Sequence, residues 1–476
     1  MIRAAIVSLC LAAVLHCVPA AAQQVAQPNI VLGRPTDQTI AVSLVSWDAA
    51  QQVYLEYGTT SGRYGETSQA ISLVRGAPAE LELAGLQPNT RYFYRVRNRA
   101  GNQGEWQSGA ERSFTTARSP GTTFTFAVQG DSHPERAGRM FQSDLYARTM
   151  DLVASERPDF YVMLGDDFSL QPAITRRQLS AATVDAVYAN QRTYLGRMAH
   201  STPIFLANGN HEEAGQVWLD GRPDNPAVLA GSARTRFFPL PAPNAFYSGD
   251  RTEVEFVGLL RDYYAWTWGD ALFVVIEPYW HSPAPVDTLA MELLDRFGRG
   301  RDRDWWNISI GDEQYRWLKE TLEGSTAKYK FVFAHHVLGT GRGGIEMAPL
   351  YEWGGQGRTG AYEFARYRPG WEMPIHQLFA RTGVSAFFFG HDHIYAHQEL
   401  DGVVYQSTPN PADLTYTAFN NDAYRSGTIL PNAGHLLVTV SPAAAQVDYV
   451  RSFLARDETA LQRHGMIAAT YQIAPR

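Results

Sequence analysis

Five short apolar runs in this chain each end in a turn rich in Asp, Asn and His, and this repeated pattern restricts the folds that the chain can adopt. The run over 385–389 is followed by Gly390 and then by His391 and His393. Apolar runs of this length, bounded by turn residues, predict buried strands. A packed interior gains nothing from imidazoles at a strand end, whereas a metal ion gains two ligands on a stiff support.

The other four runs end in the same way. In chain order they lead into Asp131 and His133, Asp166 and Asp167, Asn210 to Glu212, and His335 and His336. Apolar residues at helical intervals over 141–153 separate the first two runs, so we expect parallel strands in a layered α/β domain. Because ligands bind beyond the carboxyl ends of strands in such sheets, the five turns are expected to meet at one crevice.

Residues 27–117 follow another pattern. Apolar and polar positions alternate in short segments between turn residues, as in Val53-Tyr-Leu-Glu-Tyr57, which favours an all-β sandwich. The segment 86–94 resembles the tyrosine corner of fibronectin type III domains, in which a tyrosine hydroxyl ties a strand to the preceding turn. His, Asp and Glu do not gather at ligand spacing in this sequence region, so we expect a domain for packing or positioning.

The chain has 476 residues, which is too long for one ordinary core and predicts more than one domain. A linker over 117–121 separates the sandwich, placed at 23–118, from the α/β domain, placed at 122–455. Residues 456–476 are expected to form a C-terminal tail. The net charge of −7 gives no basic surface, so nucleic acid is not expected as a partner.

Residues 1–22 have the form of a secretory signal peptide. A charged start, an apolar stretch and small residues precede Gln23, the expected first residue of the mature chain. The apolar stretch is too short to span a bilayer, and no membrane anchor is expected. Both cysteines, Cys10 and Cys17, lie in this segment, so the mature chain would have neither a disulfide nor a thiolate ligand. A periplasmic or secreted protein is predicted.

Together, the five motifs resemble the ordered motifs of calcineurin-like metallophosphoesterases. They are Gly130-Asp131-Ser-His133, Gly165-Asp166, Gly209-Asn210-His211-Glu212, Ala334-His335 and Gly390-His391-Asp392-His393. The resemblance covers about residues 124–450 and implies a four-layer αββα catalytic domain that hydrolyses phosphoesters. With the preceding fibronectin type III-like sandwich, the layout is similar to that of the purple acid phosphatase branch.

The chain departs from that branch at two positions. In the branch, the first motif lacks a histidine and an iron-binding Tyr follows the second-motif Asp by three residues; here His133 is present and Ser169 occupies the Tyr position. A ferric-tyrosinate centre is therefore not expected. Some branches of the family also place a carboxylate at the position of Ser169 to orient the third-motif histidine, and Ser169 supplies none.

The resemblance implies two metal ions that share one carboxylate. The implied ligands of the first ion are Asp131, His133, Asp166 and His393. The implied ligands of the second ion are Asp166, Asn210, His335 and His391. Carboxylate, amide and imidazole donors without thiolate suit Mn²⁺, Fe or Zn²⁺. Such a pair lowers the pKa of a shared water and gives a metal-bridging hydroxide nucleophile without a separate base.

The resemblance also implies a role for His211, which would protonate the leaving oxygen. The glycine-rich segment 339–371 is expected at the rim of the pocket, where arginine can bind a phosphoryl group with two hydrogen bonds. The candidate substrate contacts are Asn210, His336, Arg342 and Arg358. An ordinary insertion with surface arginines is the alternative reading of this segment.

The expected function is that of an exported dinuclear hydrolase acting on a small-molecule phosphoester. The resemblance favours a phosphomonoesterase of the acid phosphatase type, with a phosphodiesterase or nucleotide hydrolase as the alternative on the same site. A different hypothesis is a secreted, non-catalytic binding protein with a vestigial metal site. It is less favoured because decay usually removes ligands, and none of the implied ligands is missing.

Overall fold

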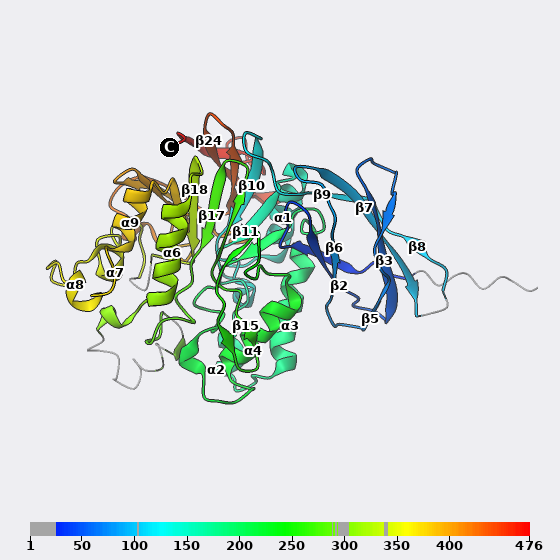
Figure 1. Cartoon of the computed structure of the whole chain (residues 1–476), viewed down its shortest axis with the longest axis horizontal. Coiled ribbons are helices and arrows are strands. Elements are labelled where there is room, and N and C mark those ends of the chain that lie inside the picture. The colour runs from blue at the N-terminus through cyan, green and yellow to red at the C-terminus, as the bar shows by residue number, and fades with distance from the viewer. Residues whose placement is uncertain (1–24, 102–103, 288, 291–292, 294–303, 338–340) are drawn as a thin grey trace, which may run out of the picture.

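The computed structural model describes residues 25–101, 104–287, 289–290, 293, 304–337 and 341–476. The predicted signal peptide over 1–22 lies outside the described residues. Two large β-sheets lie at the centre of the molecule, with helices on either side of them, and the N-terminal strands extend to one end (Figure 1).

One sheet has nine strands and contains both N-terminal and C-terminal segments of the chain. Its strands in spatial order are β25 (Ile467–Ile473), β24 (Ala445–Arg451), β23 (Gly434–Val440), β10 (Phe124–Gln129), β11 (Phe160–Met163), β12 (Ile204–Leu206), β1 (Asn29–Gly33), β2 (Ile40–Val45) and β6 (Ala79–Leu83). Strands β10, β11 and β12 pair in parallel, which confirms the prediction from the strand–helix–strand pattern.

The second large sheet has eight strands and contains the other two motif strands. In spatial order they are β13 (Ser248–Gly249), β16 (Tyr264–Trp268), β17 (Ala271–Val275), β18 (Tyr329–Ala334), β19 (Ala386–Phe389), β21 (Val403–Ser407), β20 (Tyr395–Leu400) and β22 (Thr428–Leu430). Strands β17, β18, β19 and β21 are parallel. A separate small hairpin joins β14 (Glu253–Val254) and β15 (Gly258–Leu259).

Helices cover the outer faces of both sheets. They are α1 (Ser143–Glu156), α2 (Gln171–Thr175), α3 (Ala181–Leu195), α4 (Pro226–Phe237), α6 (Asp312–Gly324), α7 (Tyr351–Gly354), α8 (Phe364–Tyr367) and α9 (Ile375–Thr382). Helices α1, α3 and α4 pack on the nine-stranded sheet, and α6, α7 and α9 pack on the eight-stranded sheet. Within the described residues, no helix combines the length and apolar character needed to cross a bilayer.

Alternation along the strands explains the four layers. In β18, Phe331 and Phe333 point into the core between the sheets, whereas Val332 packs in the core beneath the helices. Side chains two residues apart share a face of a strand, so a run that is apolar throughout must be covered on both sides. The central layer is rich in rings: the Phe126 ring lies 5.4 Å from Phe160 and 5.1 Å from Phe273. The fold class predicted from the sequence is confirmed.

The N-terminal lobe is the predicted all-β sandwich. Its second sheet contains β4 (Glu66–Thr67), β3 (Gln51–Gly58), β7 (Arg91–Ala100) and β8 (Gln107–Ser108), with β5 (Ile71–Leu73) on β3 and β9 (Arg112–Thr115) on β7. The backbone N–H of Gln87 donates to the Tyr92 hydroxyl at 2.8 Å. This contact confirms the tyrosine corner, because the hydroxyl ties β7 to the turn before it.

The sandwich joins the catalytic domain through a shared sheet. Strand β1 pairs in parallel with β12, with Gly33 opposite Ile204, so β1, β2 and β6 continue the catalytic sheet (Figure 1). The buried guanidinium of Arg192 on α3 reinforces the junction, since it donates to Asn29 Oδ1 at 2.9 Å and to the Ser43 carbonyl at 3.0 Å. The sandwich is therefore joined directly to the sheet that carries three of the five motifs.

The end of the chain differs from the sequence prediction. Residues 456–476 were expected to form a tail, but they contain β25, which pairs antiparallel with β24 from Ala445↔Ile473 to Val450↔Ile467. The strand Ile467–Ile473 starts with three apolar residues and then mixes polar and apolar positions, so it lacks the long apolar run of the motif strands. Backbone pairing with β24, together with the packing of Ile473, Ala469 and Tyr471 against the core between the sheets, accounts for their order.

Candidate metal centre

The five polar turns meet beyond the carboxyl ends of β10, β11 and β12 in one sheet and of β18 and β19 in the other. The contacts cross between the sheets: His335 Nε2 lies 2.9 Å from Asn210 Oδ1, and His393 Nε2 lies 3.1 Å from His133 Nε2. The single crevice predicted from the sequence is present, although two facing sheets form it rather than one. The predicted metal ligands are all buried: Asp131, His133, Asp166, Asn210, His335, His391 and His393.

These side chains form two groups on either side of Asp166. Donor atoms of Asp131, His133 and His393 lie within 4.8 Å of one another, as do those of Asp166, His335 and His391. Asp166 Oδ2 lies 3.4 Å from His133 Nε2 and 3.3 Å from His335 Nε2. A carboxylate oxygen between two imidazoles has the position required of a ligand shared by two ions.

Hydrogen bonds on the outer side of the rings decide which ring nitrogens face the centre. His335 Nδ1 donates to the Leu164 carbonyl at 2.9 Å, and the other ring nitrogen, Nε2, is turned toward Asn210 Oδ1. His133 Nδ1 likewise contacts Glu135 Oε1 at 2.8 Å. Metal-bound histidines usually donate their other ring N–H in this way. Carboxylate, amide and imidazole donors that converge in this way suit borderline-hard cations, so the residues present fit two metal ions.

The electrostatics of the bare site also call for positive charge. Burial lowers the pKa of His335, but the Asp166 and Asp131 carboxylates outweigh burial and raise it to about 10. Burial raises the pKa of Asp166, yet the His335 and His211 imidazoles hold it well below its ordinary value. Protons on the imidazoles thus take the place that cations would occupy beside these carboxylates.

The backbone of the turns is unusual. Left-handed φ values occur at four of the predicted ligands: Asp166 (59°), His133 (51°), His391 (66°) and His393 (63°). This conformation costs non-glycine residues on the order of 1–3 kcal/mol each and is enriched at functional sites. The favourable interactions of the ligands, including those with bound ions, would offset that cost.

Glu212 holds two of the turns together. Its carboxylate accepts hydrogen bonds from the backbone N–H groups of Asp166, Asp167, Phe168 and Gly209 at 2.7–3.1 Å. A Cβ at Gly209 would come within 2.3 Å of Asp166 N, so only glycine permits this approach. Burial and the Asp166 charge raise the pKa of Glu212 to about 7. Glu212 therefore fixes the turn that carries Asp166.

His211 lies at the more open side of the centre. Its Nε2 is 3.8 Å from Asp166 Oδ2, and its backbone N–H donates to Asp166 Oδ1 at 2.9 Å. The Arg136 Nη2 atom lies 3.0 Å from the same His211 Nε2. Burial lowers the pKa of His211 to about 4, although the Asp166 carboxylate opposes the shift. The metal-free chain thus holds a neutral imidazole beside the shared carboxylate.

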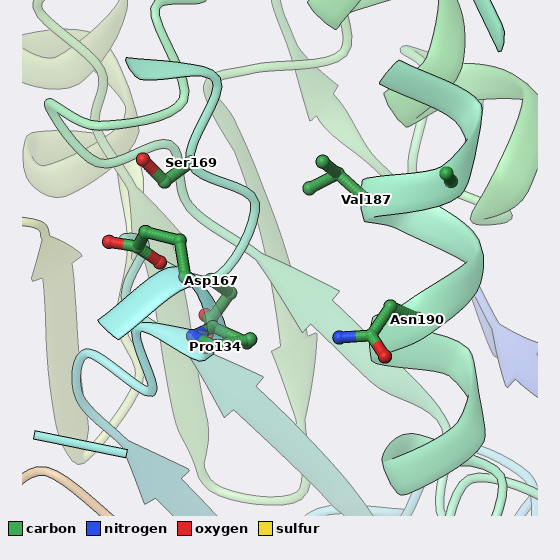
Figure 2. A pocket seen from close by; sticks show the side chains of 7 residues that line it. Pro134, Asp167, Ser169, Val187 and Asn190 are labelled. Atoms are coloured by element: carbon green, nitrogen blue, oxygen red, sulfur yellow. The ribbon is translucent and has the colours of Figure 1, made fainter. Parts of the chain in front are cut away.

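Ser169 borders a cavity of about 250 Å³ rather than the metal centre. The cavity is lined by Pro134, Glu135, Asp167, Ser169, Ala186, Val187 and Asn190. Figure 2 shows Val187 and Asn190 on α3 across the cavity from Ser169 and Asp167. Within the described residues, Ser169 Oγ has no hydrogen-bond partner. The small side chain at this position leaves an open cavity beside it, and His133 supplies an imidazole to the centre.

Asp287 supports the group of ligands around His335. Its Oδ2 lies 3.2 Å from His391 Nε2, and its backbone carbonyl accepts from Asn210 Nδ2 at 2.7 Å. These contacts turn His391 Nδ1 and Asn210 Oδ1 toward each other, 3.2 Å apart. Burial raises the pKa of Asp287, but its contact with His391 lowers it to about 2, so the carboxylate is ionised.

The predicted substrate contacts take different positions. The guanidinium of Arg342 donates to the His391 carbonyl and lies 3.2 Å from Asp392 Oδ1, so it braces the turn that bears His391. The His336 ring is buried 4.9 Å from the His391 ring. Arg358 is exposed on the loop after α7. Burial raises the pKa of Tyr351, and the charge of Arg358 opposes that shift. A substrate role for Asn210, His336 or Arg342 remains a prediction.

Sequence reasoning gave no role to four residues that shape the centre. They are Glu135, Arg136, Glu212 and Asp287. Glu135 and Arg136 lie two and three residues after the first motif, and Glu212 belongs to the third, so their proximity to motif residues was the available signal. Asp287 lies between the third and fourth motifs and carries no such local signal.

Comparison with known families agrees with this geometry. The family model for calcineurin-like phosphoesterases matches residues 124–395, more than half of the chain. The chain belongs to the calcineurin-like phosphoesterase family. A second model, the N-terminal domain of purple acid phosphatases, matches residues 25–116. The protein is thus a dinuclear metallophosphoesterase by family, and its two ligand groups supply a candidate site for the ions.

Solved structures with the same fold include a purple acid phosphatase and PhoD. The purple acid phosphatase PPD1 from yellow lupin (Lupinus luteus) seeds has a TM-score of 0.58 and 16% identity, over 94% of this chain and 74% of that chain. PhoD has a TM-score of 0.62 and 13% identity, over 95% of this phosphoesterase and 92% of PhoD. Among curated proteins, none matched the sequence. At these identities the structural likeness establishes the fold alone.

Proposed function

We propose that this phosphoesterase is an exported phosphomonoesterase of the acid phosphatase type. The observation that carries the proposal is the pair of ligand groups that share the buried Asp166, with His211 at their edge. Bound ions would supply a hydroxide at neutral pH and would draw negative charge from the phosphoryl oxygens. The residues would be divided as the family resemblance implies, with Asp131, His133 and His393 on one ion and Asn210, His335 and His391 on the other.

The chain's own residues would orient the substrate and move one proton. Hydrolysis forms a bond from the attacking oxygen to phosphorus and breaks the bond to the leaving oxygen, which then needs a proton. His211 Nε2, close to the shared Asp166, is the group that we assign to this transfer. The imidazole is neutral in the metal-free chain, and the negative charge of a bound substrate would favour its protonated form.

Export and metal identity belong to the same proposal. Residues 1–22 would direct the chain to the periplasm or the medium, with Gln23 as the mature N-terminus. The donor set supports Mn²⁺, Fe or Zn²⁺, because imidazole, amide and carboxylate are borderline-hard ligands. N-terminal sequencing of protein recovered from cell fractions would test the export route, and a mature chain that retained Met1 would contradict it.

Activity measurements would test the function. Protein loaded with Mn²⁺, Zn²⁺ or Fe would be assayed on p-nitrophenyl phosphate and bis(p-nitrophenyl) phosphate. We expect faster turnover of the monoester, whereas a preference for the diester would favour a phosphodiesterase. Asp166→Asn should abolish turnover of both substrates, because it removes the shared carboxylate, while circular dichroism shows a folded chain. Full activity of this variant would refute the proposed site.

Metal content would separate the enzyme from a non-catalytic binding protein. We expect two tightly bound ions per chain, each held by one of the two ligand groups. Fewer than two ions, together with no turnover of either ester, would favour a binding protein with a vestigial site.

A further inference from the structure

We infer that Arg136 binds the phosphoryl group of the substrate and makes the site select phosphomonoester dianions over diester monoanions. The inference rests on the proposed phosphohydrolase function. It assigns a residue outside the five motifs to the substrate, next to the candidate proton donor His211.

The position of Arg136 places its charge at the edge of the metal centre. It follows His133 in a short 3-10 helix, Pro134–Arg136, and its Nη2 atom reaches His211 Nε2 at 3.0 Å. That nitrogen is 3.8 Å from Asp166 Oδ2. The His211 side chain therefore lies between the guanidinium and the carboxylate that the two ligand groups share. Its side chain is 31% exposed, so a substrate can reach it from solvent.

The contact between Arg136 and His211 brings the guanidinium to the nitrogen that we assign to proton transfer. A guanidinium only donates and stays protonated in proteins, so His211 Nε2 must accept this hydrogen bond. For proton transfer, the leaving oxygen of the substrate must come close to the same Nε2. A phosphoryl group beside that nitrogen would therefore also lie within reach of the Arg136 guanidinium, which needs an acceptor oxygen. A phosphoryl oxygen has the required charge and lone pairs.

Neighbouring side chains hold the Nε atom of Arg136 in place and leave its Nη groups available to a substrate. Glu135 Oε1 lies 3.4 Å from Arg136 Nε and 2.8 Å from His133 Nδ1, which fixes the start of the guanidinium relative to a predicted metal ligand. Among the residues that the structure describes, the hydrogen-bond partner of Nη1 is a weak acceptor, Met140 Sδ, at 3.2 Å. The Nη groups can therefore turn from His211 and Met140 to a substrate at little cost.

Charge and oxygen count explain why this arginine would favour monoesters. At neutral pH a phosphomonoester carries nearly two negative charges and three terminal oxygens. A diester carries one charge and two terminal oxygens, because its third position is esterified. Arg136 would contact the terminal oxygen that is esterified in a diester. Replacing Arg136 should therefore slow monoester hydrolysis much more than diester hydrolysis.

The test compares Arg136→Gln and Arg136→Lys with the matched control Arg139→Gln, which changes an exposed arginine three residues away. The metal-loaded variants would be assayed on p-nitrophenyl phosphate and bis(p-nitrophenyl) phosphate, and their metal content measured. Arg136→Gln should keep two ions but lower kcat/KM for the monoester by about 10- to 100-fold. Diester hydrolysis should change by less than about threefold, Arg136→Lys should recover part of the loss, and Arg139→Gln should match the parent.

An equal loss on both esters would overturn the inference, since it would show that Arg136 merely positions His211. An unchanged monoester rate with two ions bound would overturn it as well. Inorganic phosphate gives a readout that does not depend on turnover: by calorimetry, the metal-loaded Arg136→Gln protein should bind phosphate about tenfold or more weakly than the parent. If the parent hydrolyses neither ester, the proposed function fails. Weaker phosphate binding by the variant would still support the role of Arg136, and unchanged binding would refute it.

Discussion

Removing the Asp287 carboxylate should weaken the binding of one ion and spare the other. In Asp287→Ala, His391 loses the partner that lies 3.2 Å from its Nε2, while the backbone carbonyl of residue 287 can still accept from Asn210 Nδ2. Loss of such outer partners typically costs about 10- to 100-fold in metal affinity, or about 1.4–2.7 kcal/mol. The backbone N–H of His391 also remains fixed by Asp131 Oδ2 at 2.8 Å, so we expect the lower part of that range.

The assay is a competition between the metal-loaded protein and a chelator, with the ions retained per chain measured by mass spectrometry. Asp287→Ala should release one ion at a chelator concentration about tenfold lower than the parent does, and the second ion at the parent's concentration. Asp287→Asn keeps an acceptor oxygen and should fall between the two. Parallel loss of both ions, or no change in either, would refute the division of ligands into two groups around Asp166.

Two further predictions concern stability. Glu212→Gln places an amide group against the backbone donors of the turn that bears Asp166. The substitution should lower the free energy of unfolding, measured by urea titration, by about 2 kcal/mol or more. An unchanged midpoint of unfolding would contradict the role assigned to Glu212. His281 Nε2 lies 2.9 Å from Asp262 Oδ2, and this contact outweighs burial to raise its pKa from 6.5 to about 9. Because the folded pKa is the higher one, the stabilisation is complete below pH 6.5 and is lost as pH rises through 9. His281→Gln should thus be less stable than the parent at pH 6, by on the order of 3 kcal/mol, and should approach the parent above pH 9; a constant difference between pH 6 and 10 would refute the ion pair.

The sequence predicted the strands of the catalytic domain because their residues are buried on both faces. The run at 160–164 appears as β11 with every strand residue buried, and that at 385–389 as β19. The ligand turns could be predicted for the same reason, since a polar residue directly after such a strand lies at the sheet edge. A strand with this pattern can be recognised from its own residues, without knowing which strands lie beside it.

Features that depend on pairing between distant segments could not be predicted in this way. Strand β25 mixes polar and apolar residues and is ordered by pairing with β24 and by packing against the core between the sheets. The continuation of the catalytic sheet into the sandwich rests on the pairing of Gly33 with Ile204, which no local pattern encodes. Asp287 reaches His391 from a segment about 100 residues away in sequence, so only the three-dimensional structure connects them.

The two histidines of the last motif face the centre through different ring nitrogens, and this difference explains how one turn can serve two ions. His391 presents Nδ1, 3.2 Å from Asn210 Oδ1, because Asp287 holds its Nε2. His393 presents Nε2, 3.4 Å from Asp131 Oδ1. The Nδ1 atom is one bond closer to the backbone than Nε2 along the ring, so the two residues reach different depths from one short turn. Because His391 belongs to one ligand group and His393 to the other, a single strand end helps to set the spacing of the two groups.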